Sequence, residues 1–317
     1  MERGSKEKPS IKLRPVQELY NPASRLTIRP KTSGLYIHEP HIVYAEAYGI
    51  GLVMDIFKPI SNPNGYGIID VVSNGWFSDR HQLIQHIGLG VYDVLCSQGY
   101  SVFALSPGSI QVFNGMQMIR NVQAGIQYIV SHAEQFNIDK NRLGIMGISA
   151  GGHLAINALF QETKFTGRLP IEKKPYYKNI PAIALFCAPT DLLSLYSLTS
   201  LPFDVKDILK RLARKKTFLD EELNQNKNEL ETNLINLSPI YFQMEKVETP
   251  PSILLFHGTK DMMVPFLQSE NFYKKIKTLQ WDGELIIKQN APHIWKDMST
   301  DFDYSGKWFL KRLIKIQ

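Results

Sequence analysis

The stretch RLGIMGISAGGHLAINAL, residues 142–159, joins a short apolar run to a glycine-framed serine and then to a run of helix-forming residues. Its centre, Gly147-Ile148-Ser149-Ala150-Gly151, has the G-x-S-x-G pattern of a nucleophile elbow, a strained turn that projects the serine Oγ outward. Side chains at the flanking glycines would collide where the strand and the helix approach each other. The stretch therefore predicts a buried strand, a nucleophilic Ser149 and a helix that begins at Ala150.

Strands and helices alternate on both sides of this stretch. The segment 41–59 predicts an edge hairpin that turns at Gly49-Ile50-Gly51. Short apolar runs predict buried strands at residues 68–72, 102–105, 182–187, 252–256 and 285–288. Helices are predicted at residues 82–98, along the helical spacing from Ile119 to Ala133, and at the end of the chain, where Trp308, Phe309, Leu313 and Ile316 point inward. This alternation favours an α/β fold with a mostly parallel central sheet and helices on both faces.

The composition is that of a globular protein. Hydrophobic residues make up 44% of the 317 positions and charged residues 21%, and no apolar run is long enough to span a membrane. The formal net charge of +6 comes with no recognised nucleic-acid-binding motif, so no nucleic-acid partner is expected. Cys96 and Cys187 suggest buried, reduced thiols. The charged start of the chain lacks the apolar core of a signal peptide, and we expect a soluble, cytoplasmic protein.

The domain organisation follows from where the alternation is interrupted. Residues 1–40 are rich in proline and basic residues and predict an N-terminal arm, while residues 41–317 predict one catalytic domain. Two insertions interrupt that domain, at residues 163–181 and at about 192–250. The longer one contains an amphipathic helix with Val205, Ile208, Leu209 and Leu212 on one side. Because insertions after strand ends lie over the active site in α/β enzymes, we expect the segment 192–250 to form a cap or lid.

A serine nucleophile needs a base and an acid that orients the base, and candidates for both follow downstream strands. Asp261 lies in the loop after the predicted strand 252–256, and His293 lies in the loop after the strand 285–288. The order Ser149, Asp261, His293 is the one that this type of hydrolase uses. Asp191, which follows the strand 182–187, is an alternative acid. His153 and His257 are interpreted as structural residues that pack and form hydrogen bonds.

Backbone N–H groups must also stabilise the negative charge that develops on the substrate oxygen. One donor is expected to be the amide of Ala150. The second is expected in the turn Ser73-Asn74-Gly75-Trp76 after the early strand, from Gly75 or Trp76 with Asn74 adjacent.

Four motifs together resemble the α/β-hydrolase superfamily. They are the turn 73–76, the elbow Gly147 to His153, His257-Gly258-Thr259-Lys260-Asp261 with Val264-Pro265, and His293 followed by Trp295. Within that superfamily the chain is similar to esterases and lipases related to hormone-sensitive lipase, to acetyl-xylan and feruloyl esterases, and to prolyl-oligopeptidase-like hydrolases. The resemblance covers about residues 41–317. It implies an α/β-hydrolase fold with a cap insertion, and implies that Ser149 is the nucleophile, Asp261 the acid and His293 the base.

Two motifs depart from the family pattern. The usual oxyanion loop is His-Gly-Gly-Gly-Trp, whereas this chain has Val-Ser-Asn-Gly-Trp at residues 72–76. The histidine loop has Ala291-Pro292 where glycines are more common.

The sequence therefore predicts a serine hydrolase that cleaves small carboxylic esters through an acyl-enzyme, with no cofactor and no metal site. Two alternatives stay open. The same residues would cleave amides or peptides if the pocket accepted them, and the altered oxyanion loop is compatible with a catalytically silent binding protein of the same fold.

Overall fold

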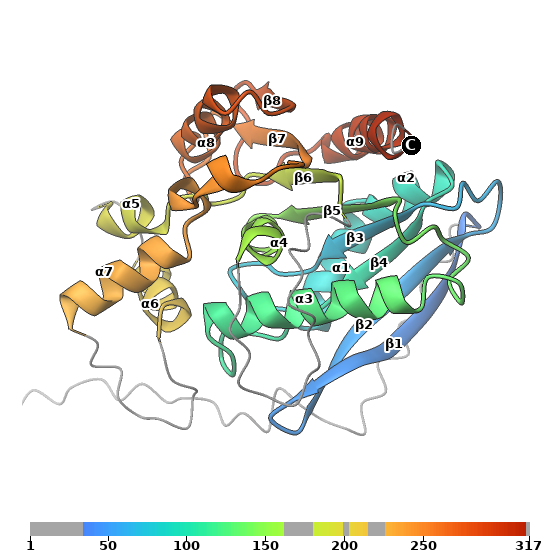
Figure 1. Cartoon of the computed structure of the whole chain (residues 1–317), viewed down its shortest axis with the longest axis horizontal. Coiled ribbons are helices and arrows are strands. Elements are labelled where there is room, and N and C mark those ends of the chain that lie inside the picture. Colours follow the sequence, from blue (N-terminus) through green and yellow to red (C-terminus); the bar gives the residue numbers. More distant parts are fainter. Residues whose placement is uncertain (1–33, 162–179, 199–202, 215–225, 315–317) are drawn as a thin grey trace, which may run out of the picture. The chain divides into compact units, whose positions relative to one another are not determined.

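The computed structural model describes residues 34–161, 180–198, 203–214 and 226–314. The chain divides into two units, Met1–Thr32 and Ser33–Gln317, and only the second is described (Figure 1). Most of the predicted N-terminal arm, like the insertion 163–181 apart from its last two residues, lies outside the described residues. The end of the predicted arm is the start of the first strand, which begins at Tyr36 rather than at residue 41.

One sheet of eight strands forms the centre of the described part, in the spatial order β1-β2-β4-β3-β5-β6-β7-β8. Strands β1 and β2 form an antiparallel hairpin at one edge, and β2 is also antiparallel to β4. All other neighbouring strands are parallel. The strands are β1 (Tyr36–Ala47), β2 (Ile50–Pro59), β3 (Gly67–Val71), β4 (Ser101–Leu105), β5 (Leu143–Ile148), β6 (Ala182–Phe186), β7 (Ser252–Gly258) and β8 (Gly283–Lys288). The predicted edge hairpin and mostly parallel sheet are confirmed.

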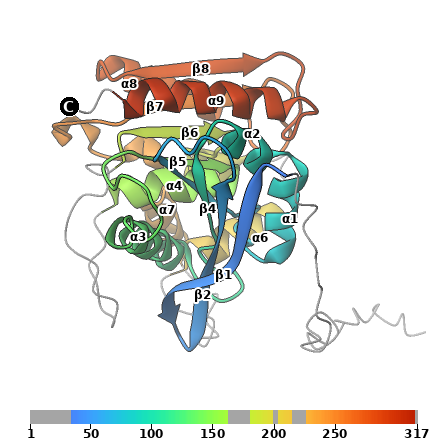
Figure 2. The ribbon, with the colours of Figure 1, turned by 90° about the vertical axis from the view of Figure 1, so that its right-hand side faces the viewer.

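Helices cover both faces of this sheet, as predicted (Figures 1 and 2). Side chains of one strand alternate between the two faces: on β3, Ile69 and Val71 face one hydrophobic core, and Ile68 faces the other. The first core contains residues of α3 (Gly115–Ser131), α4 (Ala150–Phe160) and α8 (Leu267–Thr278). The second contains residues of α1 (Arg80–Gly88), α2 (Val91–Ser97) and α9 (Met298–Leu313). Each fully buried Leu, Ile or Phe contributes about 1.5–3 kcal/mol to folding.

The segment 82–98, predicted as one helix, forms two. Helix α1 ends at Gly88, and α2 begins at Val91 after Gly90, whose φ of 82° is left-handed. A left-handed residue interrupts the helical hydrogen bonds, and glycine adopts it without steric cost. Apolar residues are spaced as in a helix both before and after Gly90. The sequence pattern therefore predicts one continuous helix and gives no sign of the break.

The predicted strand, turn and helix around Ser149 are present as β5, Ser149 and α4. Ser149 has φ 53° and ψ −121°, a backbone conformation that non-glycine residues rarely adopt. The turn fits because two glycines let backbone approach backbone. A Cβ at Gly147 would lie 2.3 Å from the carbonyl carbon of Gly151, and a Cβ at Gly151 would lie 2.1 Å from the carbonyl oxygen of Val71 on β3. The elbow is therefore held against the end of the neighbouring strand.

The described residues of the insertion between β6 and β7 are largely helical. They form α5 (Leu192–Ser197), α6 (Phe203–Leu212), α7 (Lys227–Asn236) and two short 3-10 helices, η3 (Pro239–Tyr241) and η4 (Met244–Lys246). The amphipathic helix predicted around Val205 is α6, and its Leu209 and Leu212 are buried in the first core. Residues 199–202 and 215–225 of the insertion lie outside the described residues.

The final helix agrees with its predicted inward face. Trp308, Phe309 and Leu313 of α9 are buried in the second core, and Ile316 lies outside the described residues. Within the residues that the structure describes, no helix combines the length and the apolar character needed to cross a membrane.

The close approach at the elbow predicts a large difference between two Gly→Ala substitutions. Gly151→Ala places its Cβ against a backbone oxygen that cannot move aside, and it is expected to destabilise the protein by about 3 kcal/mol. Gly88→Ala is the matched control, because nothing lies within 4 Å of its Cβ position at the end of α1. It is expected to be neutral or to stabilise by up to about 1 kcal/mol. Urea unfolding of both variants measures this, and equal stabilities would contradict the described packing.

Candidate active site

The structure brings Ser149, His293 and Asp261 together in one hydrogen-bonded chain. Ser149 lies between β5 and α4, Asp261 follows β7, and His293 follows β8. The His293 Nε2 atom lies 2.9 Å from the Oγ atom of Ser149, and its Nδ1 atom lies 2.6 Å from Oδ2 of Asp261. The two loops are also joined directly, because the Lys260 N–H donates to the carbonyl of Ala291 at 3.0 Å. The three residues that the sequence predicted as a unit are therefore in mutual contact, at the carboxyl ends of parallel strands.

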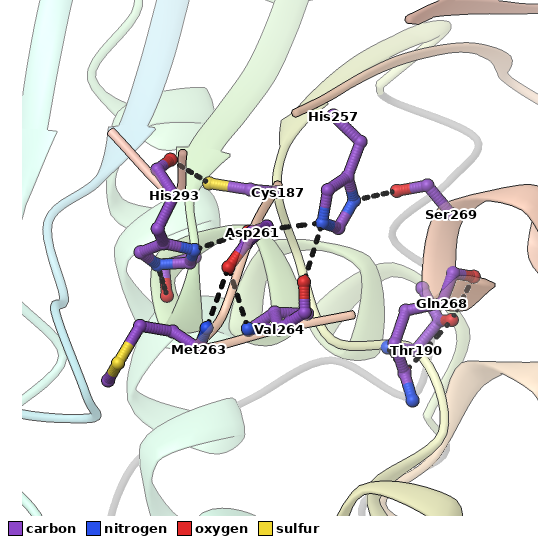
Figure 3. A network of polar contacts seen from close by, with 10 residues as sticks. Cys187, Thr190, His257, Asp261, Met263, Val264, Gln268, Ser269 and His293 are labelled. Atoms are coloured by element: carbon purple, nitrogen blue, oxygen red, sulfur yellow. Dashed lines mark hydrogen bonds and ion pairs between the residues drawn. The ribbon is translucent and has the colours of Figure 1, made fainter. Parts of the chain in front are cut away.

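The Asp261 carboxylate is surrounded by hydrogen-bond donors (Figure 3). Its Oδ1 atom accepts the backbone N–H groups of Met263 and Val264, both at 2.9 Å. Its Oδ2 atom accepts from His293 and lies 3.1 Å from Nε2 of His257. A buried carboxylate with this many donors stays ionised and keeps one orientation.

His257 is a residue whose contact with the site the sequence interpretation missed. The sequence predicts a structural residue at a strand end, and the buried ring of His257 lies against Asp261. Its Nε2 atom faces two oxygens, those of Asp261 and of the Val264 carbonyl at 2.8 Å, so Nε2 carries the proton. Nδ1 then accepts from the hydroxyl of Ser269 at 2.7 Å. The spacing of four residues between His257 and Asp261 is the signal that could have suggested the contact.

Asp191, the alternative acid, has other partners. It is the N-cap of α5, where its Oδ1 atom accepts from the N–H of Ser194 at 2.9 Å. Its Oδ2 atom accepts from the hydroxyl of Tyr241 at 3.2 Å. These contacts account for Asp191 as a helix cap, and the geometry favours Asp261 as the partner of His293.

The contact between Asp261 and His293 shifts their pKa values in opposite directions: the pKa of Asp261 is lowered and that of His293 is raised. Burial alone would raise the pKa of Asp261, but hydrogen bonds from His257, His293 and Val264 hold it well below its ordinary value. Burial alone would lower the pKa of His293, but the neighbouring Cys187 and the carboxylate of Asp261 together raise it above its ordinary value of 6.5. Asp261 thus favours the protonated form of His293, the form that follows proton transfer from a serine.

The predicted oxyanion loop is a tight turn. Asn74 and Phe77 exchange two backbone hydrogen bonds of 2.9 Å, and the central residues Gly75 and Trp76 have φ values of 56° and 63°. Two central residues with positive φ are typical of a type I′ turn. The turn is fixed to the elbow, because the carbonyl of Ser73 accepts from the N–H of Gly151 at 2.9 Å.

The four predicted oxyanion residues differ in which N–H groups are available. In the part of the chain that the structure describes, the N–H groups of Ala150, Gly75 and Trp76 donate no hydrogen bond. Asn74 uses its N–H within the turn, and its side-chain amide donates to Gln85 at 3.1 Å. The geometry therefore supports Ala150, with Gly75 or Trp76, as donors and does not support the amide of Asn74.

A buried histidine joins this turn to the insertion. The indole N–H of Trp76 donates to Nδ1 of His153 at 3.2 Å, and Nε2 of His153 donates to the carbonyl of Leu237 at 2.8 Å. Burial lowers the pKa of His153 to about 4, so the ring is neutral at pH 7 and can form both bonds. The structural role predicted for His153 is consistent with these bonds, which also connect the end of the insertion helix α7 to the oxyanion turn.

Both cysteines are buried free thiols, as predicted. Cys187 follows β6, and its Sγ atom donates to the carbonyl of His293 at 3.2 Å. Among the described residues, Cys187, Asp261 and His293 form a group whose possible metal-ligating atoms lie within 4.8 Å of one another. Two of those three residues already bind each other in the chain that includes Ser149.

A family model supports the grouping that these motifs suggested. The BD-FAE family model matches residues 54–276. The matched region includes the oxyanion turn, the elbow and Asp261, and it ends before His293.

Curated relatives and solved structures were also compared with the chain. A probable isoprenylcysteine alpha-carbonyl methylesterase of Arabidopsis thaliana is 25% identical over 176 residues, 56% of this chain and 35% of that protein. An acetylxylan esterase of Xylanibacter ruminicola is 33% identical over 106 residues, 32% of this chain and 20% of that protein. The matches thus span well under half the length of these relatives.

Among solved structures, a truncated carbohydrate esterase from gut microbiota superposes with a TM-score of 0.69 at 22% identity, and the match covers 90% of this chain and 99% of that one. The described sheet and helices are those of the α/β-hydrolase fold, as predicted.

The contact between His293 and Asp261 predicts how His293 titrates. Its pKa is expected to lie above 6.5 in the native protein and to fall in Asp261→Asn, because the carboxylate stabilises the imidazolium. The native state then binds this proton more tightly than the unfolded state. Its contribution to stability is complete below the unfolded pKa of about 6.5 and is lost as the pH rises through the native pKa.

NMR of the protein with ¹⁵N-labelled histidine measures this titration. Asp191→Asn is the matched control, because the carboxylate of Asp191 bonds Ser194 and Tyr241 and not His293, and the pKa of His293 should not change in it. A native His293 pKa at or below 6.5, or one unaffected by Asp261→Asn, would contradict the electrostatic account.

Proposed function

Because this chain belongs to the BD-FAE family, we propose that it is a carboxylic ester hydrolase that uses Ser149 as nucleophile, His293 as base and Asp261 as the acid that orients the base. The observation that carries the proposal is the unbroken hydrogen-bonded chain from Ser149 Oγ through His293 to Asp261. The distances of 2.9 and 2.6 Å are those that proton transfer requires. The matched relatives and the superposed structure all have names of ester hydrolases, which supports the same reaction class.

In the proposed acylation step, Ser149 Oγ forms a bond to the ester carbonyl carbon while its proton passes to Nε2 of His293. The electron pair of the carbonyl moves to its oxygen, which the N–H groups of Ala150 and of Gly75 or Trp76 stabilise. When the carbonyl re-forms, the bond to the alcohol oxygen breaks, and that oxygen takes the proton from His293. An acyl group then remains on Ser149.

In the proposed deacylation step, water takes the place of the alcohol. His293 removes a proton from the water as the water oxygen attacks the acyl carbon, and it returns a proton to Ser149 as the carboxylic acid leaves. Asp261 keeps His293 in the required tautomer throughout.

We propose further that the helical insertion 192–250 is a cap that supports the site. Its α7 end is tied to the elbow helix and the oxyanion turn through His153. Asn157 of α4 also donates to the same Leu237 carbonyl, at 3.3 Å. A shift of this segment would therefore be transmitted to Trp76.

The proposal predicts that Ser149→Ala abolishes ester hydrolysis. Turnover of p-nitrophenyl acetate is expected to fall by a factor of at least about 10⁴, because no other group replaces the nucleophile. The fold should persist, as judged by circular dichroism and thermal unfolding. Ser97→Ala is the control: Ser97 is an exposed serine on α2 that bonds to the carbonyl of Val94, and its loss should leave turnover unchanged.

A fluorophosphonate probe tests the same claim without a substrate. It should label the wild-type protein on the peptide that contains Ser149 and should not label Ser149→Ala. Unchanged hydrolysis in Ser149→Ala would contradict the proposal, and a folded wild-type protein that neither reacts with the probe nor hydrolyses esters would indicate a catalytically silent binding protein.

A further inference from the structure

Four large apolar side chains are exposed in the two loops that carry Asp261 and His293 and at the start of α8. Met262, Met263, Leu267 and Ile294 have exposed fractions of 84%, 47%, 59% and 43%. Met262 and Met263 follow Asp261 directly, and Ile294 follows His293. We call these four side chains the apolar rim. An exposed apolar group forgoes about 1.5–3 kcal/mol of burial, and a cluster of them typically marks a binding surface.

Hydrogen bonds hold the backbone of the apolar rim in place, although the side chains of the rim are exposed. The N–H of Met263 donates to Oδ1 of Asp261 at 2.9 Å, and Figure 3 shows the Met263 side chain extending away from that carboxylate on the side of the network where His293 lies. Leu267 begins α8, and the next residue, the buried Gln268, accepts the N–H groups of Thr190 and Asp191 at 2.8 and 2.7 Å. The apolar rim is thus a prearranged surface with flexible methionine side chains, which adapt to ligands of varied shape.

The chemistry of the proposed reaction decides which part of an ester would meet this surface. His293 Nε2 must give its proton to the alcohol oxygen, so that oxygen has to come within about 3 Å of Nε2. The alcohol chain then leaves on the His293 side of the network, where Figure 3 shows the Met263 side chain, and Ile294 follows His293 directly in the chain. The carbonyl oxygen instead points to the amides of Ala150 and the turn 74–77. Asn74, an exposed polar residue, belongs to this turn and so to the side of the site that faces the carbonyl oxygen.

We infer that the apolar rim is the subsite for the alcohol part of the substrate, and that the protein prefers esters of apolar alkyl or aryl alcohols to methyl esters and to esters of sugars. This inference rests on the proposed function. It concerns the alcohol and not the acyl group.

Acetate esters that differ only in the alcohol test the inference. Burying one methylene completely multiplies an association constant by about four, and a surface that covers one side of the chain should give about twofold per methylene. From methyl acetate to hexyl acetate, kcat/KM is therefore expected to rise about 30-fold. Acetylated methyl glycosides, whose alcohol part is polar, should not exceed methyl acetate.

Substitutions in the apolar rim test whether its side chains cause the dependence of kcat/KM on the alcohol. In Met262→Ser combined with Met263→Ser, the ratio of kcat/KM for hexyl acetate to that for methyl acetate should fall to below about 5. Leu267→Ser should lower the ratio about twofold. Leu310→Ser is its matched control, since Leu310 is also an exposed leucine on a helix, α9, but lies outside the apolar rim, and it should keep the wild-type ratio. A series of methyl esters with lengthening acyl chains should respond alike in wild type and in the double variant.

The outcomes separate the two proposals. If the wild-type protein hydrolyses no ester, the proposed function fails and the inference with it. If acetates are hydrolysed with no dependence on the alcohol, the esterase stands and the alcohol subsite is overturned. The subsite is also overturned if the methionine variants keep the wild-type ratio but change the oligomeric state in size-exclusion chromatography, because the apolar rim would then be an interface between copies of the chain.

Discussion

The whole site depends on a backbone contact that only glycine permits. At the end of β5 the chain reverses into α4 within one residue, and Gly151 lies so close to the Val71 carbonyl that no side chain would fit. At the same turn Ser149 has a positive φ of 53°, which non-glycine residues rarely adopt, and its Oγ lies 2.9 Å from Nε2 of His293. Gly151 also fixes the oxyanion turn, since its N–H donates to Ser73. Two elements of the proposed chemistry, the nucleophile and the anion-stabilising amides, are therefore placed by one packing constraint.

The Asp261 and His293 side of the site is held in place in a different way, because hydrogen-bond donors surround the carboxylate of Asp261. Asp261 receives two backbone N–H groups from its own loop, and two histidines approach its other oxygen. One of them, His257, is buried and directed by Val264 and Ser269, so it stabilises the acid without reaching Ser149. The other, His293, is left with one nitrogen for the serine. This division of roles explains why the same loop can carry exposed methionines: its conformation is held by the buried carboxylate and not by those side chains.

The sequence predicts the parts of this site that depend on local signals. Ser149 stands between two close glycines, and Asp261 and His293 each follow a short apolar run, so their positions at strand ends could be inferred in chain order. Contacts between distant segments could not. The bond from His153 to Leu237 spans 84 positions, and the availability of the Gly75 amide rather than the Asn74 amide depends on a turn geometry that residue types alone do not specify. Similarly, the break at Gly90 is hidden by helical spacing on both of its sides.

In the proposed mechanism Ser149 carries the acyl group during turnover. Rapid acid quenching of the wild-type protein during hydrolysis of p-nitrophenyl acetate, followed by mass spectrometry of its proteolytic peptides, detects this intermediate. One acetyl group is expected on the peptide that contains Ser149, formed before the first turnover is complete. An acetyl group on another residue, or steady hydrolysis with no acetylated peptide at any quench time, would contradict the proposed mechanism.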